Sequence, residues 1–313
     1  MRDRFEIPPE LVGERADKIV ATLAGTSRQA ARSLFARGVS VDARPVEPDE
    51  RIKGKEIEFE LPVSTPILEP EVVPFQVRYE DEHLLVVDKP AGVVVHPGAG
   101  REGRTLAAGL LMRYPELEGI GGERRAGLVH RLDKETSGLL LVARGEEVHA
   151  RLVKDLAARR IHRQYLALVH GEMDMPTGTI DAPISRDPTR PTRQKVSPEG
   201  RPSRTHYRVR WQGDGLALLE VDLETGRTHQ IRVHLAAIGH PVAGDRTYSR
   251  HRSARGLRRM FLHAAQLRLR HPVTGIELTV DSPLPVELEK ALAVHPGAMS
   301  SLSDGSAVGF SST

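Results

Sequence analysis

The stretch that decides the fold of this chain reads Gly127-Leu128-Val129-His130-Arg131-Leu132-Asp133-Lys134-Glu135-Thr136-Ser137-Gly138-Leu139-Leu140-Leu141-Val142. It sets one carboxylate, Asp133, among basic, hydroxyl and glycine residues directly before an apolar run typical of a buried strand. A carboxylate in such a position usually reacts or pairs with a cation. Taken alone, Asp133 also fits a turn aspartate that caps the next element.

Length and composition indicate a large domain with a smaller one attached, because 313 residues exceed one average domain. Cysteine is absent, which excludes thiol nucleophiles, Cys-ligated zinc and disulfides, and gives no reason to expect an oxidising compartment. The first residues carry no apolar run resembling a signal peptide, and no stretch approaches membrane-spanning length. We therefore expect a soluble cytoplasmic protein with no membrane partner.

Positive charge is concentrated in one part of the chain, although the net charge is only +3. Residues 151–275 carry 23 Lys and Arg against 11 Asp and Glu, a net of +12, whereas the rest of the chain is mildly acidic. Such a block suits a polyanion, because each neutralised phosphate releases counterions. A solvated Arg-rich face is the alternative.

The segment 13–62 has the pattern of a small domain with two helices and short strands. Apolar residues recur at helical spacing over 16–23, and Ser27 and Gly38 bracket a second predicted helix over 28–37. Strands are expected at 39–41 and 56–61. Four basic side chains gather on the second helix and the following loop, as RNA contacts or as ordinary surface charges: Arg28, Arg32, Lys53 and Lys55.

The remaining chain predicts an α+β domain between a connector and a tail. Four prolines lie within residues 62–76, which favours an extended connector over 63–76. Over 77–292, strand-like runs outnumber the helical segments 104–113, 146–160 and 229–238, and their irregular order predicts a mixed or antiparallel sheet. Residues 293–313 are rich in Ser, Gly and Ala and are expected to form a disordered tail.

Four clusters, read together, resemble the RluA/RluD family of RNA pseudouridine synthases. Residues 88–98 begin Asp88-Lys89-Pro90-Ala91-Gly92, residues 130–138 match the catalytic signature, and 161–167 contain Arg163-Gln164-Tyr165. The fourth includes Arg227-Thr228-His229-Gln230-Ile231-Arg232 and continues to Gly244-Asp245. The start of the chain, with Arg15-Ala16-Asp17, resembles the S4 RNA-binding domain. The resemblance spans residues 13–290.

The resemblance implies an S4-like α/β domain over 13–62, followed by a pseudouridine synthase domain that isomerises uridine to pseudouridine without metal or organic cofactor. It makes Asp133 the nucleophile and Arg232 its partner, since burial disfavours a carboxylate unless a cation lies beside it. Tyr165 would stack on the uracil and assist removal of the C5 proton. A phosphate-binding Arg232 and a core Tyr165 are the alternatives. The family usually has lysine where Arg163 stands.

RNA recognition follows from the chemistry, because the target base must leave its stack to reach a buried carboxylate. His229 and His234 are five residues apart, a spacing that does not favour a metal pair on one helical face. The expected RNA-contacting residues are Arg28, Arg32, Lys53, Lys55, His96, His130, Arg131, Thr136, Arg193, Lys195, Arg204, Arg227, His229 and Gln230.

The details most resemble the branch that modifies large-subunit (23S) ribosomal RNA. We therefore expect structured RNA as the partner, either large-subunit ribosomal RNA or a ribosomal precursor particle, and a monomeric enzyme. Two alternatives stay open at this stage. One is a non-catalytic RNA-binding or ribosome-assembly factor, and the other is a synthase that acts on transfer RNA.

Overall fold

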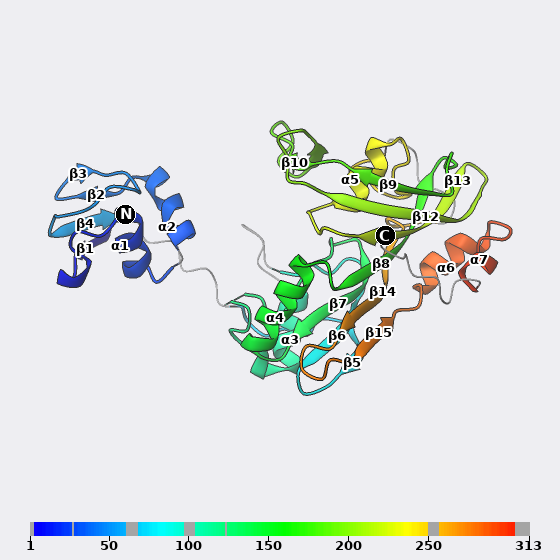
Figure 1. Cartoon of the computed structure of the whole chain (residues 1–313), viewed down its shortest axis with the longest axis horizontal. Helices are drawn as coiled ribbons and strands as arrows, with labels where there is room; N and C mark the ends of the chain where they lie inside the picture. Colours follow the sequence, from blue (N-terminus) through cyan, green and yellow to red (C-terminus); the bar gives the residue numbers. More distant parts are fainter. Residues whose placement is uncertain are drawn as a thin grey trace. The chain divides into compact units, whose positions relative to one another are not determined.

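The computed structural model describes residues 3–26, 28–60, 68–96, 104–122, 124–249 and 257–303, without the side chains of residues 29 and 30. The chain divides into two compact units, residues 1–67 and 68–313 (Figure 1). In the described residues no helix is long and apolar enough to cross a membrane.

The first unit packs two short helices against a four-stranded antiparallel sheet in the order β1-β4-β2-β3. Phe59 is fully buried and stacks on Phe5 with ring centroids 4.8 Å apart. Gly38, at φ 89°, ends the second helical segment as predicted, whereas Ser27 lies outside the described residues. The elements are β1 Asp3–Glu6, η1 Pro9–Leu11, α1 Ala16–Leu23, α2 Arg28–Leu34, η2 Phe35–Arg37, β2 Ser40–Val41, β3 Arg44–Pro45 and β4 Glu56–Phe59.

The second unit is built on a nine-stranded mixed sheet, which confirms the predicted α+β class. Its order is β5-β6-β7-β14-β8-β13-β12-β9, with β15 added beside β14. Among the described strands of this sheet, β7 and β14 form the one parallel pair. The strands are β5 Gln76–Glu80, β6 Leu84–Lys89, β7 Ser137–Ala143, β8 His162–His170, β9 Thr177–Asp181, β12 Arg204–Gly213, β13 Leu216–Leu223, β14 Leu262–Arg270 and β15 Glu277–Asp281.

Helices cover both faces of this sheet, which explains why its central strands are apolar at successive positions. In β6, Leu85 and Val87 belong to the cluster that contains α3, whereas Leu84 and Val86 pack with Leu152 of α4. A separate hairpin, β10–β11, precedes β12 (Figure 1). The remaining elements are α3 Leu106–Arg113, η3 Pro115–Leu117, α4 Glu146–Ala157, β10 Ile184–Arg186, β11 Gln194–Val196, α5 Gln230–Ala237, α6 Val286–Ala293 and α7 Ser300–Ser303.

The described part of the predicted connector is packed against the second unit. Leu68 and Val73 are buried in the core beside α3, and the Glu71 amide donates to the Ala108 carbonyl at 3.2 Å. Residues 61–67 lie outside the described residues. Residues 68–75 are therefore an extended part of the large unit, held by apolar side chains that stand between the prolines.

The prediction of a disordered tail over residues 293–313 is wrong for residues 293–303, because they pack against the second unit's sheet. Ala298 is fully buried, the Trp211 indole N–H donates to the Pro296 carbonyl at 3.0 Å, and Arg210 donates to the Ser301 carbonyl at 2.7 Å. The side chains of this segment are mostly small, and the large side chains that hold it, Trp211 and Arg210, come from strand β12. Residues 304–313 lie outside the described residues.

Candidate active site

Asp133 lies in a loop that leaves and re-enters the sheet just before β7. The loop is closed by backbone hydrogen bonds from Val129 to Leu141 and from Ala143 to Gly127, at 3.0 and 2.8 Å. Gly127 has φ 71°, and a Cβ there would be 2.1 Å from the Ala143 carbonyl oxygen. The close backbone approach therefore requires glycine at the base of the loop.

Lys89 anchors the same loop from the end of β6. Its side chain is fully buried, and its ammonium group donates to the carbonyls of Pro90, Val93 and Lys134 at 2.9, 2.9 and 3.1 Å. Burial lowers the pKa of Lys89 to about 7, although the Asp133 charge opposes the shift. Lys89 thus ties the 90–93 turn to the residue that follows Asp133.

Arg232, on α5, lies between two carboxylates. Its Nη1 donates to Asp133 Oδ2 at 2.9 Å, while its Nε and Nη2 donate to Asp245 Oδ2 and Oδ1 at 2.7 and 2.9 Å. Burial alone would lower the pKa of Arg232, but hydrogen bonds and charge from the two aspartates outweigh it and raise the pKa. The guanidinium is therefore a fixed cation that is aimed at Asp133.

The other carboxylate oxygen of Asp133, Oδ1, is not hydrogen-bonded to Arg232. His229 has Nε2 3.9 Å from Asp133 Oδ1, beyond hydrogen-bonding distance, and a left-handed backbone at φ 57°. Among the described residues, no hydrogen bond reaches Oδ1, so this oxygen is exposed to the cavity in front of it. A non-glycine residue held at positive φ beside the carboxylate is the kind of strain found at functional sites.

A cavity of about 690 Å³ opens over Asp133. Tyr165, on β8, is only 5% exposed and lines it, and burial raises the pKa of this phenol. The cavity gathers ten of the seventeen predicted site residues, from segments far apart in the sequence: His96, His130, Arg131, Asp133, Thr136, Tyr165, Arg227, His229, Gln230 and Arg232.

Four cavity-lining side chains carry a buried polar atom with no hydrogen-bond partner among the described residues: His130 Nδ1, Thr136 Oγ1, Arg163 Nε and Glu224 Oε2, of which the last is ion-paired with Arg159. The Leu141 amide donates to His130 Nε2 at 3.2 Å, so the proton of the neutral ring is on Nδ1. Burial lowers the pKa of His130 to about 3, which keeps the ring neutral. Buried donors without partners are costly, so these atoms indicate a site that a polar ligand completes.

Arg163 is a buried cation without a carboxylate partner in the described residues. Its side chain donates to one protein group, the Leu223 carbonyl, at 3.3 Å. Burial lowers its pKa, which expresses the cost of an uncompensated charge. Arg163 therefore supplies the cavity with positive charge.

Gln230 lines the cavity but is used internally. Its Oε1 accepts from the Thr225 hydroxyl and the Arg227 amide at 2.8 and 3.0 Å, and its Nε2 donates to Arg204 and Thr205 oxygens, each at 3.0 Å. The side chain is thereby saturated. Gln230 supports the 225–230 turn and has no free donor for RNA, contrary to the prediction.

Three predicted RNA-contacting residues of the second unit lie outside the cavity. Lys195 is exposed on β11, and Arg193 precedes it in the same hairpin. Arg204 is held by Asp181, with Nη2 to Oδ2 at 2.6 Å. His96, inside the cavity, bonds through Nδ1 to the Arg124 carbonyl at 3.2 Å, and burial lowers its pKa to about 4.

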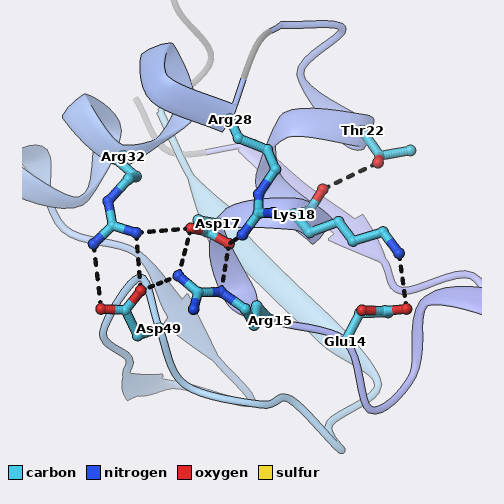
Figure 2. Close-up of polar contacts among 8 residues, drawn as sticks. All are labelled: Glu14, Arg15, Asp17, Lys18, Thr22, Arg28, Arg32 and Asp49. Atoms are coloured by element: carbon cyan, nitrogen blue, oxygen red, sulfur yellow. Dashed lines mark hydrogen bonds and ion pairs between the residues drawn. The ribbon is translucent and has the colours of Figure 1, made fainter.

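The predicted basic face of the first unit is an ion-pair cluster (Figure 2). Asp17, whose side chain is 2% exposed, accepts from Arg28 and Arg32 at 2.9 Å each and from Arg15 at 2.9 Å. Arg32 also contacts Asp49 at 2.8 Å. The arginines are fixed in position rather than free, while Lys53 and Lys55 are exposed on their loop.

Sequence reasoning missed Asp245 and the residues around it as site residues. Asp245 is 3% exposed and accepts the amides of Thr247 and Tyr248 at 2.8 and 3.2 Å in addition to Arg232. The sequence feature that could have identified Asp245 is the Gly244-Asp245 pair at the end of the fourth cluster. In the described part of the chain, no group of three or more His, Asp or Glu residues forms a metal-binding arrangement.

Comparison with known proteins gives the family. The family model described as RNA pseudouridylate synthase matches residues 83–237. A protein of Chloroflexus aurantiacus named as an uncharacterized RNA pseudouridine synthase is 46% identical over 290 residues, 91% of each chain. A Nitrosomonas europaea protein, named ribosomal large subunit pseudouridine synthase D, is 42% identical over 298 residues, 91% of this chain and 86% of that one.

A solved structure shows the same fold. Human RNA pseudouridylate synthase domain containing 1 is 32% identical and aligns with a TM-score of 0.55 over 69% of this chain and 86% of its own. The family-model match contains the loop of Asp133, strand β8 with Tyr165, and helix α5. The chain belongs to the RNA pseudouridine synthase family.

Proposed function

We propose that this chain converts specific uridines of large-subunit ribosomal RNA to pseudouridine, with Asp133 as the nucleophile. The observation that carries the assignment is the position of Asp133, with Oδ2 bonded to a fixed Arg232 and Oδ1 open to a cavity of about 690 Å³. The names of the relatives, including synthases of the large ribosomal subunit, support the substrate.

The reaction is an isomerisation that needs no external group. The bond from ribose C1′ to uracil N1 breaks, a new bond joins C1′ to C5, the proton on C5 leaves, and N1 gains one. Asp133 Oδ1 is placed to add to the substrate and later leave, while the hydrogen bond from Arg232 holds the carboxylate in position. Tyr165, with its proton retained, offers a ring face to the base and a phenol near the reacting atoms.

The unpartnered polar atoms of the cavity suit a flipped nucleotide. Uracil and its phosphate carry oxygen acceptors, which the Nδ1–H of His130 and the Nε–H of Arg163 would satisfy. A purely structural RNA-binding protein has no need for an open carboxylate beside such donors. The cavity therefore favours the enzyme over the non-catalytic alternative.

RNA binding by the rest of the molecule is part of the proposal. In the second unit, the β10–β11 hairpin carries Arg193 and Lys195, and its strand β11 contacts α5. In the first unit, which we take to be an S4-like domain, Asp17 and Asp49 hold three arginines in place, so that the cluster carries a net positive charge. We expect a cytoplasmic monomer that acts on large-subunit RNA or its precursor particle.

The test of the nucleophile uses Asp133→Asn and a matched control on the same loop, Glu135→Gln, whose side chain is exposed. Asp133→Asn should abolish pseudouridine formation and leave RNA affinity within a few-fold, whereas Glu135→Gln should keep activity. Full activity of Asp133→Asn would overturn the assignment. Mapping pseudouridines in ribosomal and transfer RNA of cells with and without the protein identifies the substrate, and loss confined to transfer RNA would contradict it.

A further inference from the structure

Tyr248 lies where three parts of the second unit meet. It follows Asp245, whose Oδ1 accepts the Tyr248 amide at 3.2 Å, so the carboxylate that holds Arg232 also fixes this backbone. The side chain is partly buried.

The Tyr248 ring packs against two guanidinium groups. The Cζ of Arg232 is 5.0 Å from the ring centroid, and the Cζ of Arg193, from the hairpin, is 5.1 Å from it. Arg193 also donates to the carbonyl of Thr247. The ring is thus a contact surface shared by the catalytic arginine and the hairpin.

The hydroxyl of Tyr248 contacts the imidazole ring of His229. It accepts the Gln194 amide at 2.8 Å and lies 2.9 Å from His229 Nδ1, and these are its hydrogen bonds in the described part of the chain. A phenol has one proton to donate, and Nδ1 is the acceptor within reach. When the phenol donates to Nδ1, the neutral imidazole carries its own proton on Nε2, the atom 3.9 Å from Asp133 Oδ1.

We propose that Tyr248 is a positioning residue that holds His229 with its Nε2 proton directed at Asp133 and makes this arrangement depend on the docked β10–β11 hairpin. The inference rests on the proposed function, because it takes Asp133 as the nucleophile. His229 Nε2–H is then a neutral donor for a substrate oxygen beside the carboxylate. The hairpin contributes through the Gln194 amide, which orients the hydroxyl.

The first test needs no RNA and no turnover. In full-length protein with ¹⁵N-labelled histidine, the His229 signals are assigned by their loss in His229→Gln. We expect wild-type His229 to be protonated on Nε2 with Nδ1 as an acceptor, and Tyr248→Phe to lose this preference. Protonation on Nδ1 in the wild type, or an unchanged tautomer in Tyr248→Phe, would overturn the proposal.

The second test separates positioning from binding. Under single-turnover conditions on an RNA that the wild type modifies, Tyr248→Phe should slow pseudouridine formation roughly tenfold while RNA affinity stays within about twofold. The matched control is Tyr114→Phe, which loses a hydroxyl bond to Glu80 of 2.8 Å outside the cavity and should keep the wild-type rate. An unchanged rate in Tyr248→Phe would contradict the role.

The two tests also distinguish this inference from the proposed function. If the wild type modifies no RNA but shows the Nε2 tautomer and its loss in Tyr248→Phe, the proposed function fails and the hydrogen-bond assignment stands. If the wild type is active and the tautomer does not respond to Tyr248→Phe, the proposed function stands and the positioning role fails.

Discussion

Asp245 accepts two hydrogen bonds from Arg232, from Nε at 2.7 Å and from Nη2 at 2.9 Å, while Nη1 of the same guanidinium donates to Asp133. Burial of this carboxylate raises its pKa, but the hydrogen bonds and charge of Arg232 outweigh burial and lower it. Asp245→Asn should misplace the guanidinium and slow pseudouridine formation roughly a hundredfold with little change in RNA affinity. It should also cost about 3 kcal/mol of unfolding free energy.

The matched control is Asp181→Asn, which breaks the exposed ion pair with Arg204. This pair is solvated, so its loss should change stability by less than about 1 kcal/mol and leave the rate unchanged. Equal effects of the two substitutions would argue against a special role for Asp245. Urea unfolding followed by fluorescence suits the comparison, because the single tryptophan, Trp211, lies in the second unit.

Asp17 should make the first unit sensitive to acid. The hydrogen bond from Arg15, with those of the other arginines, outweighs burial and lowers the pKa of Asp17 from 3.8 to about 2. A carboxyl with a lowered folded-state pKa stabilises above its unfolded pKa and loses that contribution as the pH falls. We expect about 2 kcal/mol to disappear between about pH 4 and pH 2.

Hydrogen exchange of the α1 amides in the full chain measures this effect. Asp17→Asn should weaken protection at neutral pH and flatten its dependence on acid, whereas Glu10→Gln, at an exposed position of the same unit, should retain the wild-type profile. Protection of wild-type α1 that does not change down to pH 2 would refute the prediction.

Arg163 should contribute to ligand binding at the expense of stability. Arg163→Met removes a buried charge that has no carboxylate partner, so the unfolding free energy should stay the same or rise by about 1 kcal/mol. The same change should slow pseudouridine formation at least about tenfold. Tryptophan fluorescence in urea and single-turnover assays measure the two effects.

Arg210→Met is the contrasting variant, because Arg210 is paired with Glu220 at 3.5 Å and bonded to the Ser301 carbonyl. It should lose stability and keep the catalytic rate of its folded fraction. If Arg163→Met is the more destabilised of the two and remains fully active, Arg163 is a structural residue and the prediction fails.

Gly138 should tolerate no side chain. It has φ 111°, and a Cβ there would lie 2.2 Å from the Ala264 carbonyl oxygen. Gly138→Ala should therefore separate β7 from β14 and cost about 3 kcal/mol or more. Gly145→Ala, at a position with extended backbone and open space, should cost no more than about 1 kcal/mol. Comparable urea midpoints for the two variants would contradict this reading.

Local sequence patterns were sufficient to predict the central strands and the longer helices. The apolar run that follows Asp133 corresponds to β7, the equally apolar residues 84–87 lie in β6, and the predicted helical segment 146–160 contains α4. These elements are buried by neighbours on both sides, so their own residues carry the signal. The helix over 229–238 was found for the same reason.

Elements that owe their structure to a distant partner were not predictable. Strand β1 is a short, polar-rich segment that is stabilised by pairing with β4, 54 residues later at Arg4 and Glu58. The packed segment 293–303 depends on Trp211 and Arg210. Such contacts leave no periodicity in the segment itself.

The residues of the candidate site also fall into those that the sequence predicted and those that it did not. Asp133 and Tyr165 stand in motifs that chemistry and resemblance single out, and Arg232 was expected beside Asp133, 99 residues away. Asp245 and Tyr248 contact Arg232 and His229, and the Gly244-Asp245 pair in the sequence does not reveal which residue Asp245 would bind. Gln230 was misjudged because a motif does not reveal whether an amide is already saturated.

The parallel pairing of β7 with β14 has a consequence for how the enzyme is made. Ser137 is bonded to His263, 126 residues later, and the Asp133 loop is supported by that strand pair. During synthesis every described strand and helix of the first unit is present once β4 has been made, whereas the catalytic loop must wait until β14 leaves the ribosome. An unfinished chain can therefore hold a folded first unit long before it can carry out chemistry on RNA.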